Sequence, residues 1–258
     1  MPSVTVSGTT VPYAKTGTGP GLVLIHGTTV GAQSNFGHVL RHFTDRRKVI
    51  TPDYAGCGES TIPDGPLSLE LLIEQIAAVA RDASPAPLDF LGDSLGAVVA
   101  AATAARHPEL VRRLVLVAGW ADSADPRHQL IFETWIRLQE SSPELGSRFV
   151  ISLGVSPAFL TELGPETIRA FAAQPQPAHT LRRIQLGQRI DIRDAARRIL
   201  APTLILRGSQ DYLIPEYQTR VLHELISGSR YESLDCGHAG FLEKPNEIAR
   251  RARDFLLE

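Results

Sequence analysis

Three residues of the sequence have the types needed for nucleophilic acyl transfer. Ser94 lies in the pentapeptide Gly92–Gly96, which reads G-D-S-L-G, and Asp211 and His238 follow it in glycine-containing loops. A serine hydroxyl is a poor nucleophile at neutral pH, so it needs an imidazole to take its proton and a carboxylate to orient that imidazole. Ser94, His238 and Asp211 are therefore the candidates for a catalytic triad.

The residues around Ser94 predict a strand, a sharp turn and a helix. The apolar pair Phe90-Leu91 suits a short buried parallel strand, and the Ala/Val-rich run 97–102 favours a helix packed closely on a sheet. Gly92 and Gly96 lack the Cβ atoms that would clash as strand and helix approach each other. A serine at this joint can be held with strained backbone angles, with its hydroxyl above the edge of the sheet.

Strand and helix patterns alternate along most of the chain. After an antiparallel hairpin within residues 4–13, we expect strands at 22–25, 49–50, 111–117, 203–206 and 231–234, and helices at 35–45, 67–83, 215–226 and 247–257. This alternation predicts an α/β fold, in which a mostly parallel sheet carries helices on both faces.

The alternation stops between the strand at 111–117 and the strand at 203–206. Prolines interrupt this stretch at positions that include 143, 157, 165, 175 and 177, and its clearest helix spans 125–140. A long insertion at the strand ends of an α/β sheet usually becomes functional structure, because ligands bind at that edge. We expect an α/β core at 1–120 and 191–258, with a helical cap at 121–190. Trp120 is the first candidate to line the pocket because it ends a strand near the site, and Trp135 and Thr29 are further candidates.

Several separate motifs resemble the α/β-hydrolase superfamily, in its serine-nucleophile, esterase- and lipase-like branch with a helical cap. Besides the pentapeptide, the segment 22–27 ends in a His-Gly turn, 53–60 reads D-x-x-G-x-G-x-S, and Ser, Asp and His follow in the family's order. The resemblance implies an eight-stranded sheet and an oxyanion hole formed by the backbone N–H groups of Thr28 and Leu95. It implies Asp211 as the triad acid, although some relatives carry the acid at the place of Asp122.

The function that this resemblance implies is hydrolysis of a carboxylic ester, thioester or lactone of a small, largely apolar substrate through an acyl-enzyme. The sharp turn that carries the nucleophile in this family is called the nucleophile elbow. A serine at the elbow argues against the dehalogenase and epoxide hydrolase branches, which need a carboxylate there. Two alternatives stay open. The same triad could cleave carbon–carbon bonds, or act as an acyltransferase or lyase that tailors a natural product. The fold could also serve as a non-enzymatic small-molecule receptor.

Other residues with chemical potential are expected to be structural. His38 and His42 lie one turn apart in the expected helix at 35–45, but no acidic third ligand accompanies them, so no metal site is predicted. His26 is expected to be a hydrogen-bonded structural residue. The side chain of Asp53 is expected to hold its own loop. No cofactor is expected.

Composition limits the partners and the compartment. A net charge of −2 and a pI of about 6.5 create no overall field that favours nucleic acid or an anionic membrane. The start of the sequence has no signal-peptide pattern, no apolar run is long enough to cross a bilayer, and two isolated cysteines make no disulfide framework. We therefore expect a cytoplasmic protein, monomeric or homodimeric, whose partner is a small-molecule substrate.

Overall fold

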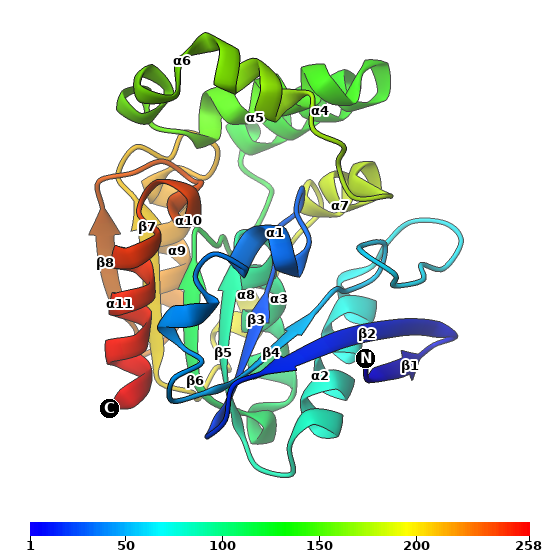
Figure 1. Cartoon of the computed structure of the whole chain (residues 1–258), viewed down its shortest axis with the longest axis vertical. Helices are drawn as coiled ribbons and strands as arrows, with labels where there is room; N and C mark the ends of the chain where they lie inside the picture. Colours follow the sequence, from blue (N-terminus) through cyan, green and yellow to red (C-terminus); the bar gives the residue numbers. More distant parts are fainter.

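The computed structural model describes residues 1–258 and contains one open sheet of eight strands (Figure 1). The spatial order is β1-β2-β4-β3-β5-β6-β7-β8. The six strands from β4 to β8 in this order run parallel, whereas β1 and β2 form an antiparallel hairpin at one edge. The strands are β1 (Ser3–Val6), β2 (Thr9–Thr16), β3 (Gly21–Ile25), β4 (Lys48–Pro52), β5 (Leu88–Asp93), β6 (Val111–Val117), β7 (Thr203–Gly208) and β8 (Arg230–Leu234). The predicted fold class, a mostly parallel eight-stranded α/β sheet, is thereby confirmed.

Helices flank the sheet on both faces and fill the long segment between β6 and β7. They are α1 (Ala32–Phe36), α2 (Leu69–Ala83), α3 (Leu95–Arg106), α4 (Pro126–Ser141), α5 (Pro143–Gly154), α6 (Pro157–Ala172), α7 (Thr180–Gly187), α8 (Arg193–Ala196), α9 (Glu216–Leu225), α10 (Gly240–Glu243) and α11 (Pro245–Leu257), with 3₁₀ helices η1 (Leu40–His42) and η2 (Pro108–Leu110). No helix has both the length and the apolar character required to cross a membrane. Both cysteines are buried free thiols.

The helix predicted at 35–45 is wrong in its bounds and continuity. The chain forms the short helix α1 at 32–36 and then the separate 3₁₀ helix η1. Helix α1 begins at Ala32, earlier in the chain than predicted, because the N–H of Ala32 donates to the carboxylate of Asp53 at 2.7 Å. The local sequence does not reveal this long-range cap. Gly37 is the C-cap of α1, and a glycine inside a helix costs about 1 kcal/mol relative to alanine, which disfavours continuation.

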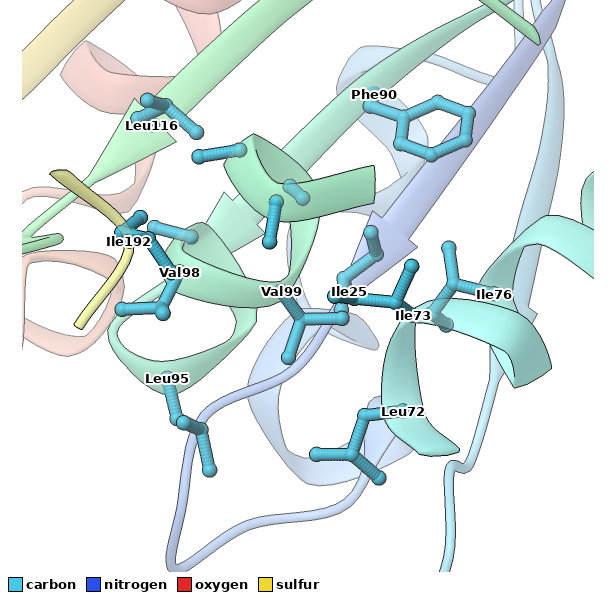
Figure 2. Packing of buried hydrophobic residues seen from close by; sticks show 14 of the residues in the cluster. Ile25, Leu72, Ile73, Ile76, Phe90, Leu95, Val98, Val99, Leu116 and Ile192 are labelled. Atoms are coloured by element: carbon cyan, nitrogen blue, oxygen red, sulfur yellow. The ribbon is translucent and has the colours of Figure 1, made fainter. Parts of the chain in front are cut away.

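The two faces of the sheet have separate hydrophobic cores, because successive strand residues point in opposite directions. On β3, Val23 and Ile25 join a cluster with residues of α2 and α3, while Leu22 and Leu24 join a second cluster with residues of α1 and α11. Figure 2 shows α3 in the first cluster, with Val98 and Val99 among side chains of the neighbouring strands and of α2. The central strands are thus covered on both sides, which explains their continuous apolar runs.

Helix α3 lies unusually close to the strands beneath it. A Cβ atom on Gly92 would lie 2.2 Å from the carbonyl oxygen of Gly96, and one on Gly96 would lie 2.0 Å from the carbonyl oxygen of Ile25. Real Cβ atoms do not approach backbone so closely. These two glycines therefore permit the contact between β5, α3 and β3 that sets the position of Ser94.

The segment between β6 and β7 lies at the carboxyl ends of the parallel strands. Figure 1 shows α4, α5 and α6 above the sheet, with α7 nearer to the strands. Asp122 and Asp191 form an isolated antiparallel bridge, which brings the two ends of the segment together. Within it, the rings of Phe132 and Trp135 pack edge to face at 5.5 Å. The segment therefore covers the sheet edge where Ser94 lies.

Candidate active site

Ser94 occupies the sharp turn between β5 and α3 in a backbone conformation that only glycine adopts readily. Its φ of 55° and ψ of −119° lie outside the regions that are favourable for residues with a Cβ. Such a conformation costs about 1–3 kcal/mol and persists only where the surroundings enforce it. The N–H of Ser94 donates to the carbonyl of Val117 at 2.8 Å, and its own carbonyl accepts from Ala97 at 2.9 Å. The neighbouring strand and the first turn of α3 thus hold the strained residue in place.

Ser94, His238 and Asp211 form a continuous chain of hydrogen bonds. The Ser94 hydroxyl donates to Nε2 of His238 at 2.8 Å, and Nδ1 of His238 donates to Oδ2 of Asp211 at 2.7 Å. The other carboxylate oxygen of Asp211 accepts from the backbone N–H groups of Leu213 and Ile214, at 2.9 and 2.8 Å. Both oxygens of Asp211 are therefore bonded, which fixes the carboxylate and, through it, the imidazole.

The carboxylates of Asp211 and Asp93 raise the pKa of His238. Burial alone lowers the pKa of His238, but the charges of Asp211 and Asp93 and the hydrogen bond to Asp211 raise it, and its pKa lies above the ordinary value. Burial raises the pKa of Asp93 to about 6, although His238 and the amide of Asn35 oppose this shift. The site thus stabilises the imidazolium form of His238, which is the form that appears after proton transfer from Ser94.

Asp122, the second candidate for the triad acid, lies elsewhere. Its carboxylate accepts from the N–H of Ala124 at 3.0 Å, and its backbone bridges to Asp191. It has no hydrogen bond or ion pair with His238. The carboxylate that contacts the imidazole is therefore that of Asp211.

The backbone N–H groups of Thr28 and Leu95 have no hydrogen-bond partner within the protein. One side chain, that of Asn35 on α1, links the two segments that carry them. The N–H of Gly27 donates to Oδ1 of Asn35 at 2.9 Å, and Nδ2 of Asn35 donates to Asp93 at 2.9 Å. Asn35 is buried and thus fixes the residue before Thr28 relative to the residue before Ser94. Nothing in the sequence around Asn35 pointed to this role.

The segment around α1 also supports the loop that carries His238. Nε2 of His38 donates to the carbonyl of Phe241 at 2.8 Å, and the rings of Phe36 and Phe241 pack edge to face at 5.3 Å. The sequence predicted a structural role for His38 in a helix at 35–45, without a partner. The partners lie about 200 residues apart in the chain, so local patterns could not have revealed this contact.

A cavity of about 270 Å³ adjoins Ser94 and His238. The predicted pocket residues Trp120, Trp135 and Thr29 all line it. The lining is mainly apolar and includes no lysine or arginine. Its remaining residues are Gly27, Thr28, Val30, Ser34, Asn35, His38, Asp93, Ser94, Phe132, Val150, Leu213, Ile214, His238, Ala239, Phe241 and Leu242. An uncharged ligand therefore fits this cavity better than an anion.

His26, Asp53 and Cys57 offer three possible metal ligand atoms within 4.8 Å of one another. Two observations oppose a cation there. The Asp53 carboxylate already accepts from the N–H of Ala32, and the buried guanidinium of Arg183 donates to the carbonyls of Thr28 and Gly56 beside the cluster. We assign the cluster a structural role. The Asp53 side chain caps α1 through Ala32, a role that was not predicted, and its backbone carbonyl accepts from the Ser60 hydroxyl within its own loop.

Comparison with known proteins finds one family and relatives of several activities. The profile of the family described as alpha/beta hydrolase fold matches residues 20–245. A pyrrolizixenacetamide deacetylase of Xenorhabdus hominickii is 35% identical, over 100% of this chain and 98% of that protein. A 2-hydroxymuconate semialdehyde hydrolase of Pseudomonas sp. strain CF600 is 29% identical, over 94% of this chain and 88% of that protein. The enol-lactonase from Burkholderia xenovorans LB400 superposes with a TM-score of 0.86 over 100% of both chains at 23% identity, a likeness of fold alone.

Proposed function

The chain belongs to the alpha/beta hydrolase fold family, and on that premise we propose that it hydrolyses a carboxylic ester or a related acyl compound with a small, uncharged acyl group. The observation that carries this proposal is the hydrogen-bond chain from Ser94 through His238 to Asp211. This arrangement gives a serine hydroxyl both a proton acceptor and a carboxylate that fixes the tautomer of that acceptor.

In the proposed first half-reaction, Ser94 Oγ bonds to the carbonyl carbon while its proton passes to Nε2 of His238. The carbonyl π pair moves onto oxygen, and the N–H groups of Thr28 and Leu95 bind that oxyanion. Donors placed in advance in this way are worth about 3–4 kcal/mol each in the transition state. Neither N–H group has a hydrogen-bond partner within the protein, so both are available to bind an oxyanion, which supports this role. The oxyanion then collapses, the bond to the leaving group breaks, and His238 gives its proton to the leaving atom.

In the proposed second half-reaction, water replaces the leaving group. His238 takes a proton from water as the water oxygen bonds to the acyl carbon, and the same two N–H groups bind the second oxyanion. Collapse breaks the bond to Ser94, which recovers its proton from His238, and releases a carboxylic acid. The charge of Asp211 favours the imidazolium in both steps.

The cavity limits the acyl group. A volume of about 270 Å³ is at or below the lower end for small-molecule sites, and the lining carries no cation to bind a carboxylate. The relative with 35% identity is named a deacetylase, so acetyl is the first acyl group to test. We further propose that residues 121–190 act as a cap, from which Trp135 contributes to the wall of the cavity, while Trp120 and Thr29 contribute from the core.

Covalent labelling tests the proposal most directly. We expect a fluorophosphonate to add one phosphonyl group per wild-type chain, detected as a single mass increment of the intact protein and located on Ser94 by peptide sequencing. The Ser94→Ala variant should show no increment under the same conditions. Acetate release from phenyl acetate, followed by NMR, then identifies the products.

The possible outcomes separate the alternatives. An adduct on another residue, or equal labelling of Ser94→Ala, contradicts the proposed nucleophile. A wild-type protein that takes no label and releases no acetate supports the receptor interpretation instead. Labelling of Ser94 without acetate release, together with cleavage of a carbon–carbon bond in a diketone substrate, favours a carbon–carbon hydrolase instead of an esterase.

The acid limb of the pH profile reports the state of His238. Only neutral His238 can accept the serine proton, so kcat/KM should fall as the pH drops through its pKa, which lies above the ordinary 6.5. In Asp211→Asn, loss of the carboxylate should move this limb to lower pH and reduce the plateau about 10⁴-fold. Asp122→Asn is the matched control, and both the acid limb and the plateau of its kcat/KM profile should match those of wild type. An unchanged limb in Asp211→Asn, with a changed limb in Asp122→Asn, would assign the triad acid to Asp122.

A further inference from the structure

We propose that a second, larger groove beside the cavity binds the leaving part of the substrate, and that this part is an uncharged polar group with a flat ring. The inference rests on the proposed function and extends it, since it concerns the half of the substrate that does not acylate Ser94. The substrate class would then be a small acyl group, acetyl first, on a flat, neutral, hydrogen-bonding alcohol or amine.

The groove adjoins the cavity at Ser94. Its volume is about 950 Å³, more than three times that of the cavity. Both spaces share the wall formed by Thr29, Val30, Ser34 and Val150. In the proposed binding mode, a substrate whose carbonyl lies at Ser94 places its leaving part on the groove side of these four residues.

Core loops and the helices above them form the groove together. Its remaining lining residues are Gly31, Gln33, Asp53, Cys57 and Gly58 from the core, and Ser147, Ile151, Phe171, Gln174, Pro175, Gln176 and Pro177 from α5, α6 and the turn that follows. Figure 1 shows these helices above α1. A ligand here thus contacts both parts of the chain.

The polar lining of the groove is almost entirely uncharged. It consists of amides and hydroxyls, with Asp53 as the one acidic residue and no lysine or arginine. A carboxylate or phosphate would meet no cation here, and the partly exposed Asp53 would repel it. Amides and hydroxyls both donate and accept hydrogen bonds, which suits a neutral polar ligand.

Two kinds of side chain in the groove are free to bind such a ligand. The amides of Gln33 and Gln174 are exposed and make no hydrogen bond within the protein, unlike Gln176, which bonds to Gln139 and Ser147. Phe171 lines the same groove and is 44% exposed. An aromatic face next to free amides matches a flat ring that carries hydrogen-bonding groups. Phe171 is thus the stacking surface, and Gln174 is the polar contact.

The test compares two acetyl esters that differ only in the leaving part. 4-Acetoxybenzamide carries a neutral amide on its ring, and phenyl acetate does not. We expect Gln174→Ala to raise KM for 4-acetoxybenzamide about tenfold and KM for phenyl acetate by less than twofold, because only the first ester carries the amide. Phe171→Ala should raise KM for both esters about tenfold, because both carry the ring that stacks on Phe171. In each variant kcat should stay within twofold of wild type. Because each variant is compared with wild type on the same ester, differences in intrinsic reactivity cancel.

Leu130→Ala is the matched control. Leu130 is a large apolar residue on α4 that is 66% exposed and lines neither space, so its truncation should leave both substrates unaffected. A third ester, 4-acetoxybenzoate, should have a kcat/KM at least tenfold below that of the benzamide ester in wild type. Equal effects of Gln174→Ala on both neutral esters, or no effect of Phe171→Ala on either, would overturn the groove proposal.

A binding measurement separates this inference from the proposed function. Ser94→Ala cannot turn over an ester, so calorimetry can follow its binding of 4-acetoxybenzamide. Addition of Phe171→Ala should weaken that binding about tenfold, because Phe171 contacts the leaving part of the ester and not its carbonyl. Binding that is unchanged contradicts the groove, while a protein that binds the ester at Phe171 but takes no fluorophosphonate contradicts the proposed nucleophile alone.

Discussion

Replacing Ser94 by glycine should abolish turnover and yield a protein that is more stable than Ser94→Ala. Loss of the hydroxyl removes the proposed nucleophile, so we expect kcat/KM to fall about 10⁵–10⁶-fold in both variants. Their stabilities should differ, because residue 94 has a φ of 55° and a ψ of −119°. A Cβ in that conformation costs about 1–3 kcal/mol, and glycine avoids most of this cost.

The expected difference is about 1 kcal/mol in the free energy of unfolding. The larger entropy of glycine in the unfolded chain offsets about 0.5–1 kcal/mol of the relieved strain. Urea unfolding of both variants at pH 7 measures the difference, provided that their m-values agree. Ser94→Ala is the matched control because it also lacks the hydrogen bond to His238. A glycine variant less stable than the alanine variant would mean that residue 94 is not strained. Turnover close to the wild-type rate in either variant would exclude Ser94 as the nucleophile.

The strained backbone of Ser94 requires small residues on both sides of it, which explains why the strand, sharp turn and helix around Ser94 could be predicted from the sequence. A serine can take this conformation only where the chain on both sides approaches closely, and close approach requires Gly92 and Gly96. The requirement is local, so it appears within five residues. The hydrophobic periodicity of the strands and helices is local too, and most elements of the core were therefore predicted near their observed bounds.

The parts that sequence reasoning missed depend on contacts between distant segments. Asn35 links Gly27 to Asp93, and His38 reaches Phe241, but neither residue lies in a recognisable motif. The start of α1 depends on Asp53, which lies 21 residues further along the chain. The choice between Asp122 and Asp211 likewise required the position of His238. These features arise from the packing of loops at one sheet edge, which periodicity does not describe.

The same reasoning gives the largest expected effect on stability, that of Gly96→Ala. A Cβ on Gly96 would lie 2.0 Å from the carbonyl oxygen of Ile25 and 2.5 Å from that of His26. Both atoms are backbone, so no side-chain rotation can relieve the clash, and α3 must move away from β3. We expect a loss of more than about 4 kcal/mol in the free energy of unfolding, measured by urea unfolding. The displacement also moves the N–H of Leu95, so any folded fraction should react poorly with fluorophosphonate.

Gly65→Ala separates this clash from the general cost of replacing a glycine. Gly65 has a φ of 76° but no atom within 4 Å of an added Cβ, so its replacement should cost only about 1–2 kcal/mol and leave the labelling of Ser94 intact. If Gly96→Ala were no more destabilising than Gly65→Ala, α3 could shift without loss of packing. The elbow would then be adaptable, and the strained conformation of Ser94 could not depend on the close contact between α3 and β3. A large difference between the two variants instead means that the fold itself holds Ser94 and Leu95 in position, before any substrate binds.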